Sequence, residues 1–487
     1  MTVRISSGGA GSGTVTSSDG KVNCSACTVQ YAVIVALRSR ITLTATPNST
    51  STFAGWGGSC TGTAPTCTMG IGGNSIAIAY YRSTSKNVVA GGFHSCVLRP
   101  AGDIVCWGFN NEGEVAAVEA QGSLPVTPVP GITNAVAISA GGFHTCALIA
   151  GGTIRCWGLD AQGQLGKGSA NKVPGVTSIV SGISDAIAVS AGGYHTCAIR
   201  ATGGVLCWGY NSDGQIGNGN TNPQGLPQPV TIPTVFGANV GVAQISAGGF
   251  HTCALLMNGG VLCWGRNSEG ELGINNTSPP GTSTVTVPVV AGSDNLGNNV
   301  PSGLLSATYI ASAIGVGQQG LTQMGGFHTC GIDSTGMAVC WGWNLNGQVS
   351  GSGSGGLFDN AFPANIPLAI QYPWASDFTI PPPVLKMATG AFHSCILRST
   401  GILCWGFNQN GELGNGTFGG DTYTVVSGTA GATDVAAGGS HTCAVLIGAA
   451  GAGSPSRVAC WGYNGFGEVT GTPTSNNFAT IQILSAP

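Results

Sequence analysis

Seven histidines, all found in one sequence context, are the residues of this chain best suited to chemistry. Each lies in a Gly-Gly-Phe-His-Thr-Cys motif or a close variant of it, and a Cys-Trp-Gly motif follows each one. One histidine and two cysteines per repeat could bind zinc as a three-ligand site, could combine a structural histidine with a disulfide, or could line a central axis as a cofactor ring. The histidines are His94, His144, His195, His251, His328, His393 and His441.

The spacing of the cysteines favours disulfides over zinc. The two cysteines of a repeat are ten residues apart in five repeats, nine in the sixth and seventeen in the seventh. A hairpin with glycine at its turn places such residues directly opposite each other, within reach of a disulfide, whereas variable spacing would distort a tetrahedral zinc site. We predict the pairs Cys96–Cys106, Cys146–Cys156, Cys197–Cys207, Cys253–Cys263, Cys330–Cys340, Cys395–Cys404 and Cys443–Cys460. They indicate an oxidising compartment and an exported protein, with no metal and no cofactor.

The remaining residue types give no catalytic site. Every histidine belongs to the repeat, where we expect it to hold the backbone of its own strand and turn by a hydrogen bond, so none is left for a catalytic triad. Acidic residues are few, most glutamates belong to a repeated Gly-Gln/Glu turn, and no glycine-rich segment precedes a helix that could cradle phosphate. The repeated tryptophan is expected in the core between repeats rather than on a sugar-binding surface. We therefore predict that the protein is not an enzyme.

Short strands must position these residues. Residues 137–148 alternate small and apolar side chains as a buried strand does, a glycine turn follows at 150–152, and residues 153–157 alternate again. After each Cys-Trp-Gly comes an Asn, replaced by Asp160 in the second repeat, and then a proline-containing segment such as 125–129 that fits an edge strand. A unit of about fifty residues with four strands is typical of a propeller blade, and no segment holds a helical period.

These motifs resemble the regulator of chromosome condensation repeat, whose family forms seven-bladed propellers. The resemblance runs from about Asn87 to the C-terminal end, and it implies a closed ring in which a C-terminal strand at 478–484 completes a blade begun near Val88. The chain departs from cytosolic members by adding a cysteine pair to every blade. Nothing in it matches the wedge or basic tail that nucleotide exchange or chromatin binding would use, so those activities are not expected.

Residues 1–85 lack the repeat and form a separate module in our prediction. They contain Cys24-Ser-Ala-Cys27 and a Phe-x-Gly-Trp-x-Gly-x-Cys run that ends at Cys60, followed by Cys67. The Cys-x-x-Cys motif could indicate redox chemistry or zinc, but without a βαβ context we expect two local disulfides, Cys24–Cys27 and Cys60–Cys67. The run resembles the internalin-type B-repeat of bacterial surface proteins, which implies a small β-grasp-like domain. The cysteines predict an exported protein, yet the first residues lack signal-peptide features. We therefore take the sequence as a mature form or a piece of a longer one.

The composition argues against nucleic-acid binding and against a membrane span. Only 7% of residues are charged and the net charge is -3, so no basic face for nucleic acid is expected, and no apolar run is long enough to span a membrane. Low charge also favours self-association. Two repeats carry insertions, and the second is aromatic, with Phe358, Phe362, Tyr372, Trp374 and Phe378 as a candidate interface unless they fold back on their own blade.

The resulting prediction is an all-β protein: a seven-bladed β-propeller of four-stranded antiparallel blades over residues 86–487, preceded by a small β-rich module. We predict an extracellular or bacterial cell-surface protein that binds a protein partner through the propeller face and its long loops. Two alternatives remain open. The protein could assemble with copies of itself into a filament or surface layer, or it could inhibit an enzyme.

Overall fold

The fold was analysed in a computed structural model of the whole chain. It describes residues 2–484 except for the following segments: 26–28, 33–39, 71–74, 116–121, 169–176, 233–240, 275–281, 290–306, 314–325, 350–363, 370–382, 421–422, 448–455 and 475. Among the described residues, secondary structure consists of strands, and none of them forms a helix that could cross a membrane.

The N-terminal module consists of two four-stranded sheets with a shared core. One sheet has the order β4 (Val29–Ala32), β1 (Thr2–Gly8), β8 (Ser75–Ser83) and β6 (Ser51–Gly58), with β1 and β8 parallel. The other has the order β3 (Asn23–Ser25), β2 (Gly13–Ser17), β5 (Arg40–Pro47) and β7 (Thr66–Gly70). The alternating strand β5 buries Ile41 and Leu43 against Trp56 and Tyr81 from the first sheet, so apolar side chains of both sheets fill the space between them.

Strands β9–β36 of the described chain form seven further four-stranded antiparallel sheets, which we number as blades 1 to 7. Their strands, in chain order, are as follows. Blade 1 has β9 (Asn87–Ala90), β10 (His94–Leu98), β11 (Ile104–Phe109) and β12 (Ser123–Pro128); blade 2 has β13 (Ala135–Ala140), β14 (His144–Ile149), β15 (Ile154–Gly158) and β16 (Ser178–Ile179). Blade 3 has β17 (Ala186–Ala191), β18 (His195–Arg200), β19 (Val205–Gly209) and β20 (Gln224–Pro229); blade 4 has β21 (Val242–Ala247), β22 (His251–Leu256), β23 (Val261–Arg266) and β24 (Thr282–Pro288). Blade 5 has β25 (Ala307–Ser312), β26 (His328–Asp333), β27 (Ala338–Gly342) and β28 (Ala364–Ala369); blade 6 has β29 (Lys386–Thr389), β30 (His393–Arg398), β31 (Gly401–Gly406) and β32 (Thr424–Val425); blade 7 has β33 (Ala432–Ala437), β34 (His441–Leu446), β35 (Arg457–Gly462) and β36 (Phe478–Ile483).

The repeat motif explains the shape of each blade. In blade 1, His94 begins the second strand and Cys106 and Trp107 lie in the third, and the glycine after the tryptophan has a positive φ of 104°. A Cβ on Gly108 would lie 2.7 Å from the carbonyl oxygen of Phe93, so only glycine fits where the third strand passes the Phe-His corner. The seven tryptophans of the Cys-Trp-Gly motifs are fully buried, which confirms their predicted place in the core.

The ring closes without an exchanged strand, which corrects one expectation. The C-terminal strand β36 pairs with β35 and completes blade 7, whereas the blade begun near Val88 is completed by β12. Blades 7 and 1 are instead joined by contacts between whole sheets: the Gly439 amide donates to the Gly91 carbonyl, and the Val88 amide donates to Asp434. The ring is held by packing and hydrogen bonds across this seam.

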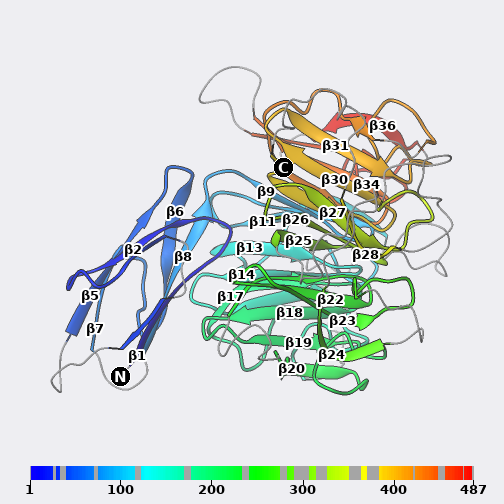
Figure 1. The fold of residues 1–487 in the computed structure, drawn as a ribbon. Helices are drawn as coiled ribbons and strands as arrows, with labels where there is room; N and C mark the ends of the chain where they lie inside the picture. The colour runs from blue at the N-terminus through cyan, green and yellow to red at the C-terminus, as the bar shows by residue number, and fades with distance from the viewer. Residues whose placement is uncertain are drawn as a thin grey trace.

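The N-terminal module docks on blades 2 and 3 (Figure 1). The Ala10 amide donates to the carbonyl of Val136, and the Tyr80 hydroxyl donates to the carbonyl of Ala186 at 2.6 Å. The Arg82 guanidinium donates to the carbonyl of Ala135. These acceptors lie near the start of the innermost strands, so the module covers one face of the propeller. The opposite face carries the Phe-His corners.

Candidate functional site

All fourteen blade cysteines form the predicted disulfides. Each pair joins directly opposed residues on the second and third strands of one blade, at Cα separations of 4.0 to 4.1 Å. The longer turn of blade 7 leaves the Cys443–Cys460 pair in the same register. Cys60–Cys67 is also formed, while Cys27 lies outside the described residues, so the Cys24–Cys27 pairing stays a prediction. The paired sulfurs are not thiolates, which removes the ligands that the zinc alternative required.

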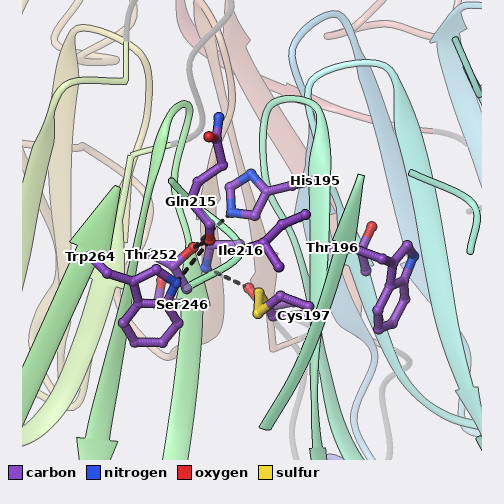
Figure 2. Close-up of a disulfide and its surroundings, with 12 residues drawn as sticks. His195, Thr196, Cys197, Gln215, Ile216, Ser246, Thr252 and Trp264 are labelled. Atoms are coloured by element: carbon purple, nitrogen blue, oxygen red, sulfur yellow. Dashed lines mark hydrogen bonds between the residues drawn. A yellow bond between two sulfur atoms is a disulfide. The ribbon is translucent and has the colours of Figure 1, made fainter. Parts of the chain in front are cut away.

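The seven histidines join each blade to the next one, and not to their own backbone as expected from sequence. In blade 3, Nε2 of His195 lies 2.8 Å from the hydroxyl of Thr252 in blade 4 (Figure 2). The same contact, at 2.7 to 2.9 Å, recurs around the ring. The pairs are His94–Thr145, His144–Thr196, His195–Thr252, His251–Thr329, His328–Ser394, His393–Thr442 and His441–Ser95. Together they form a closed circle of hydrogen bonds.

Hydrogen-bond directions fix the tautomer of five of these histidines, whose hydroxyl partners donate to a backbone carbonyl. The Thr252 hydroxyl donates its proton to the Gln215 carbonyl at 2.9 Å, so it must accept a proton from Nε2 of His195. Nδ1 of His195 is therefore unprotonated, and it is buried without a hydrogen-bond partner. Burial lowers the pKa of His195 to about 3, and the same cause acts on the other six. The imidazoles stay neutral at ordinary pH.

A second circle of hydrogen bonds involves the tryptophans. Nε1 of Trp264 donates at 2.9 Å to the same Gln215 carbonyl that the Thr252 hydroxyl uses. In all seven blades the indole donates to the backbone carbonyl of the Gln or Glu in the preceding blade, at 2.7 to 2.9 Å. The Gly-Gln/Glu turn predicted from sequence thus supplies the acceptor that holds the following blade.

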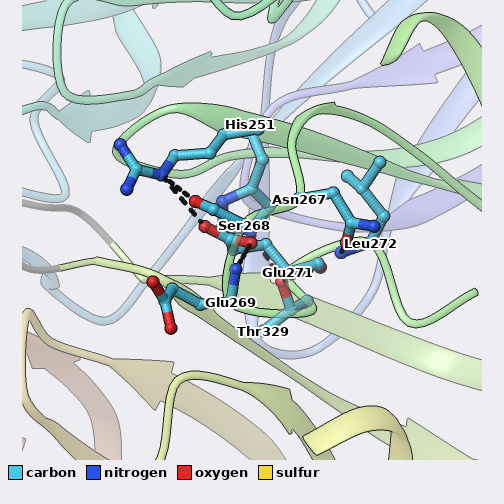
Figure 3. Close-up of polar contacts among 8 residues, drawn as sticks. His251, Asn267, Ser268, Glu269, Glu271, Leu272 and Thr329 are labelled. Atoms are coloured by element: carbon cyan, nitrogen blue, oxygen red, sulfur yellow. Dashed lines mark hydrogen bonds and ion pairs between the residues drawn. The ribbon is translucent and has the colours of Figure 1, made fainter. Parts of the chain in front are cut away.

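The side chains of this Gln/Glu position are buried too. They are Glu114, Gln164, Gln215, Glu271, Gln348, Glu412 and Glu468, and each accepts a hydrogen bond from the backbone amide two residues earlier. Burial raises the pKa of Glu114 and Glu468 to about 8 and that of Glu271 and Glu412 to about 7. A protonated carboxyl has the shape of the amide found in the other three blades. Glu271 also lies 3.4 Å from the Arg266 guanidinium (Figure 3).

The repeated Asn of the turn, which is Asp160 in blade 2, has the same role in every blade. In blade 4, Oδ1 of Asn267 accepts a hydrogen bond from the Leu272 amide at 3.0 Å. The equivalent contact exists in the other six blades, and this contact needs only an acceptor oxygen. Asp160 of blade 2 supplies that oxygen, and Lys167 balances its charge at 3.0 Å. The Asn-to-Asp change in the second repeat is therefore accommodated.

Aromatic side chains form a belt on the face opposite the N-terminal module. The residue before each histidine is aromatic in blades 1 to 6, and neighbouring rings lie 5.7 to 6.3 Å apart from blade 1 to blade 5. Trp343 joins Phe327 to Phe392, and Phe466 contacts Phe93. Blade 7 has Ser440 at the corner instead. We call this set the aromatic face: Phe93, Phe109, Phe143, Tyr194, Tyr210, Phe250, Phe327, Trp343, Phe392, Phe407 and Phe466.

One sector of the aromatic face combines a cation with exposed apolar surface. The Arg266 guanidinium lies 4.6 Å from the ring centre of Phe327 and 6.0 Å from that of Phe250. Half-buried Trp343 stands beside Phe327, and Leu345 is 59% exposed. Arginine stacked on an aromatic ring, with an exposed leucine two residues after Trp343, is a favourable composition for a protein contact. Sequence reasoning missed this sector because Arg266 and Trp343 belong to different repeats.

A central cavity of about 200 Å³ lies along the axis, lined by the innermost strands of all seven blades. Its polar groups are mostly engaged between blades. The side-chain amide of Gln244 donates to the carbonyl of Ile310 and accepts from the amide of Ile310, and the Lys386 ammonium pairs with Asp434. Asp434 also accepts from the Val88 amide across the ring seam. The polar contacts that line the cavity therefore help to close the ring. Among the described residues, no three His, Cys, Asp or Glu are grouped as a metal site.

The predicted aromatic interface lies outside the described residues. Phe358, Phe362, Tyr372, Trp374 and Phe378 all fall in the segments 350–363 and 370–382. Their role as an interface stays a prediction.

Models of one family match the repeats. Those of the Regulator of chromosome condensation (RCC1) repeat match residues 86–114, 135–164, 186–215, 242–271, 323–348 and 384–412 with one model and 152–199, 202–255 and 401–445 with another. Together they cover just over half of the chain, and the matches begin at residue 86. The resemblance of residues 1–85 to a B-repeat thus stays a prediction.

Curated relatives match over part of the chain. The human probable E3 ubiquitin-protein ligase HERC6 is 30% identical over 227 residues, which is 46% of this chain and 19% of that protein. The mouse E3 ubiquitin-protein ligase HERC2 is 28% identical over 284 residues, which is 57% of this chain and 5% of that protein. The chain therefore spans less than a fifth of the length of these relatives.

Solved structures share the fold. Yeast RCC1 (Prp20) bound to Kap60 has a TM-score of 0.62 at 19% identity, covering 79% of this chain and 84% of the other. Prp20p from Saccharomyces cerevisiae, described with its binding to Gsp1p and histones, has a TM-score of 0.61 at 20% identity, covering 79% and 86%. Human WBSCR16 has a TM-score of 0.59 at 16% identity, covering 74% and 87%.

Proposed function

This chain belongs to the regulator of chromosome condensation (RCC1) repeat family, and on that premise we propose that it is an extracellular scaffold that binds another protein through the aromatic face of its propeller. The observation that carries the proposal is the sector around Arg266, Trp343 and Leu345, which offers a stacked cation and exposed apolar surface on a rigid ring. The face is opposite the docked N-terminal module, so the module does not cover it.

Binding is favoured over catalysis by the state of the histidines. All seven are at most 1% exposed, and each Nε2 is bonded to a hydroxyl of the next blade. A general base must reach the proton that it removes from a substrate. These imidazoles serve instead to fix the blades.

An oxidising compartment is favoured by the disulfides. Every blade carries one, and cytosolic reductants keep such thiols reduced. We propose that the protein lies outside the cell, on a bacterial surface, because residues 1–85 resemble a bacterial surface module. A family member also binds a protein, since yeast RCC1 (Prp20) forms a complex with Kap60.

The test compares three full-length, oxidised chains immobilised on beads and incubated with surface and culture-medium proteins of the native source. They are the unaltered chain, Leu345→Asp in the aromatic face, and Ile179→Asp as a matched control. Ile179 is 53% exposed, on the outer strand of blade 2. We expect mass spectrometry to find a protein retained by the unaltered and control chains and at least about tenfold less by Leu345→Asp, because a charge in an apolar contact is costly. Equal retention by all three chains, or none above empty beads, would refute the proposal.

A further inference from the structure

The outer edges of the blades differ in a way that bears on self-association. The outermost strand of each described blade has a sheet partner on one side only, and such an edge can pair with another chain unless something blocks it. Strands β16 and β32 are two residues long, which leaves little edge to pair. Strand β36 has six residues, Phe-Ala-Thr-Ile-Gln-Ile, without proline and without charge.

The register shows which backbone groups of β36 point outward. Cys460 and Cys443 are directly opposed with Cα atoms 4.1 Å apart, the spacing of a pair without backbone hydrogen bonds, so the amide and carbonyl of Cys460 face β36. Gln482 is the partner of Cys460 and faces back toward it. The Leu484 amide likewise donates inward, to Val458. The amides and carbonyls of Ile481 and Ile483 therefore point away from blade 7.

Prolines occupy these outward positions in other blades. Pro128, Pro229 and Pro288 pair with the residue before the second cysteine in blades 1, 3 and 4, the place that Ile483 holds in blade 7. In blade 5, Pro367 precedes the equivalent Ala369 by two residues, the place of Ile481. Proline has no amide hydrogen and blocks strand addition. Within the described residues, β36 is the long outer strand that keeps both outward amides.

We propose that β36 pairs antiparallel with β36 of a second copy of this chain, about a twofold axis at Gln482. In this register Ile481 of one copy is opposite Ile483 of the other, and the reverse pair forms by symmetry. Each pair exchanges two backbone hydrogen bonds, which makes four in all. The loop of blade 6 covers the start of the strand, since the Gly416 amide donates to the Ala479 carbonyl, so the paired segment runs from Thr480 to Leu484.

A second copy fits this edge because the strand is complementary to itself. Its outward donors and acceptors match under twofold symmetry, and its side chains carry no charge that would repel the same strand. Ile483 is 45% exposed and gains apolar contact on pairing. Figure 1 places β36 on the opposite side of the propeller from the N-terminal module, so the docked module does not obstruct the edge. One short strand predicts a weak, concentration-dependent dimer.

The first test is sedimentation velocity of the full oxidised chain and of Ile483→Pro over a wide range of concentrations. The unaltered chain should shift from monomer to dimer, and Ile483→Pro should raise the dimer dissociation constant at least about tenfold. Three blades carry proline at this place, so the variant should keep the circular dichroism spectrum and unfolding midpoint of the unaltered chain. A monomer at every concentration, or dimerisation unchanged by the proline, would overturn the proposal.

The second test fixes the register by cross-linking. In the proposed pair, residue 482 faces its own copy at the short spacing that a disulfide can bridge. Gln482→Cys should therefore form a covalent dimer under mild oxidation, whereas Thr480→Cys, opposite Leu484 of the other copy, should not. Equal cross-linking of the two variants would contradict this register, and selective capture of a different protein by Gln482→Cys would show that the edge serves another partner.

Discussion

The imidazole of His441 lies 2.7 Å from the hydroxyl of Ser95, although 346 residues separate them in the chain. This contact joins blade 7 to blade 1 and repeats the geometry of the six other His–hydroxyl contacts. The same seam has the indole of Trp107 donating to the Glu468 carbonyl at 2.7 Å. The closing interface is therefore built like every other interface of the ring, which explains how the propeller closes without an exchanged strand.

The Ser95–His441 contact predicts a stability cost for opening the ring. Ser95→Ala leaves the buried Nε2 of His441 without its hydrogen-bond partner and should lower the free energy of unfolding by about 1–3 kcal/mol. Ser95→Thr is the control, because five blades carry threonine at this place, and it should be close to neutral. Denaturant titration of the oxidised chain measures both, and an equal effect of the two substitutions would contradict the role of the hydroxyl.

The histidines predict acid sensitivity. Burial lowers the pKa of His195 from 6.5 to about 3, so the unfolded state binds the proton more tightly than the folded state does. The stabilisation is complete above pH 6.5 and is lost as the pH falls toward 3. His195→Gln keeps a donor for Thr252 but cannot titrate. Between pH 6 and 4 its stability should fall less steeply, by up to about 1.4 kcal/mol per pH unit. Parallel curves for variant and unaltered chain in denaturant titrations would show that His195 does not titrate on unfolding.

The buried glutamates predict the opposite trend at higher pH. Burial raises the pKa of Glu468 from 4.5 to about 8, so its carboxyl favours folding at low pH and that contribution is lost as the pH rises through 8. Glu468→Gln should stabilise the chain by on the order of 1–3 kcal/mol at pH 9 and have little effect at pH 5.

The reverse substitution is the matched test of this idea. Gln215→Glu places a carboxyl at the equivalent position of blade 3 and should destabilise the chain at pH 9 but not at pH 5. Unfolding midpoints measured at both pH values decide the matter. A Glu468→Gln effect that is the same at pH 5 and pH 9 would rule out titration as its cause.

Asp434 is predicted to contribute more to ring closure than its partner Lys386. It accepts hydrogen bonds from Lys386 and from the amides of Val88 and Val435, so its removal strands donors in three blades. Asp434→Ala should cost about 1–3 kcal/mol in the free energy of unfolding. Lys386→Ala should cost less, because Asp434 keeps its two backbone donors. If Lys386→Ala lowers the stability more than Asp434→Ala does in thermal or denaturant unfolding, the role given to Asp434 between blades 7 and 1 is wrong.

Patterns within one repeat could be predicted from sequence. The Cys96–Cys106 pair and its equivalents follow from hairpin spacing, and the burial of Trp107 follows from alternation along a strand. Both features need only local geometry.

Partners in a neighbouring repeat could not be predicted in the same way. The hydroxyl that His195 bonds belongs to Thr252, one blade further along, and nothing within a repeat indicates it. The contacts of Tyr80 and Arg82 with blades 2 and 3 cannot be predicted from sequence either, because they depend on how two folded units pack together. The family's pattern of closure predicts that the C-terminal strand completes the first blade, whereas β36 pairs with β35 in blade 7.

The central claim is that the chain is a disulfide-stapled scaffold of an oxidising compartment. It is tested most directly by mass spectrometry of the intact protein isolated from its native source and treated at once with a thiol-alkylating reagent. We predict no adducts before reduction and eighteen after reduction and unfolding, one for each cysteine. Adducts on the blade cysteines of the unreduced protein would contradict the claim, because they would show free thiols where the scaffold requires disulfides.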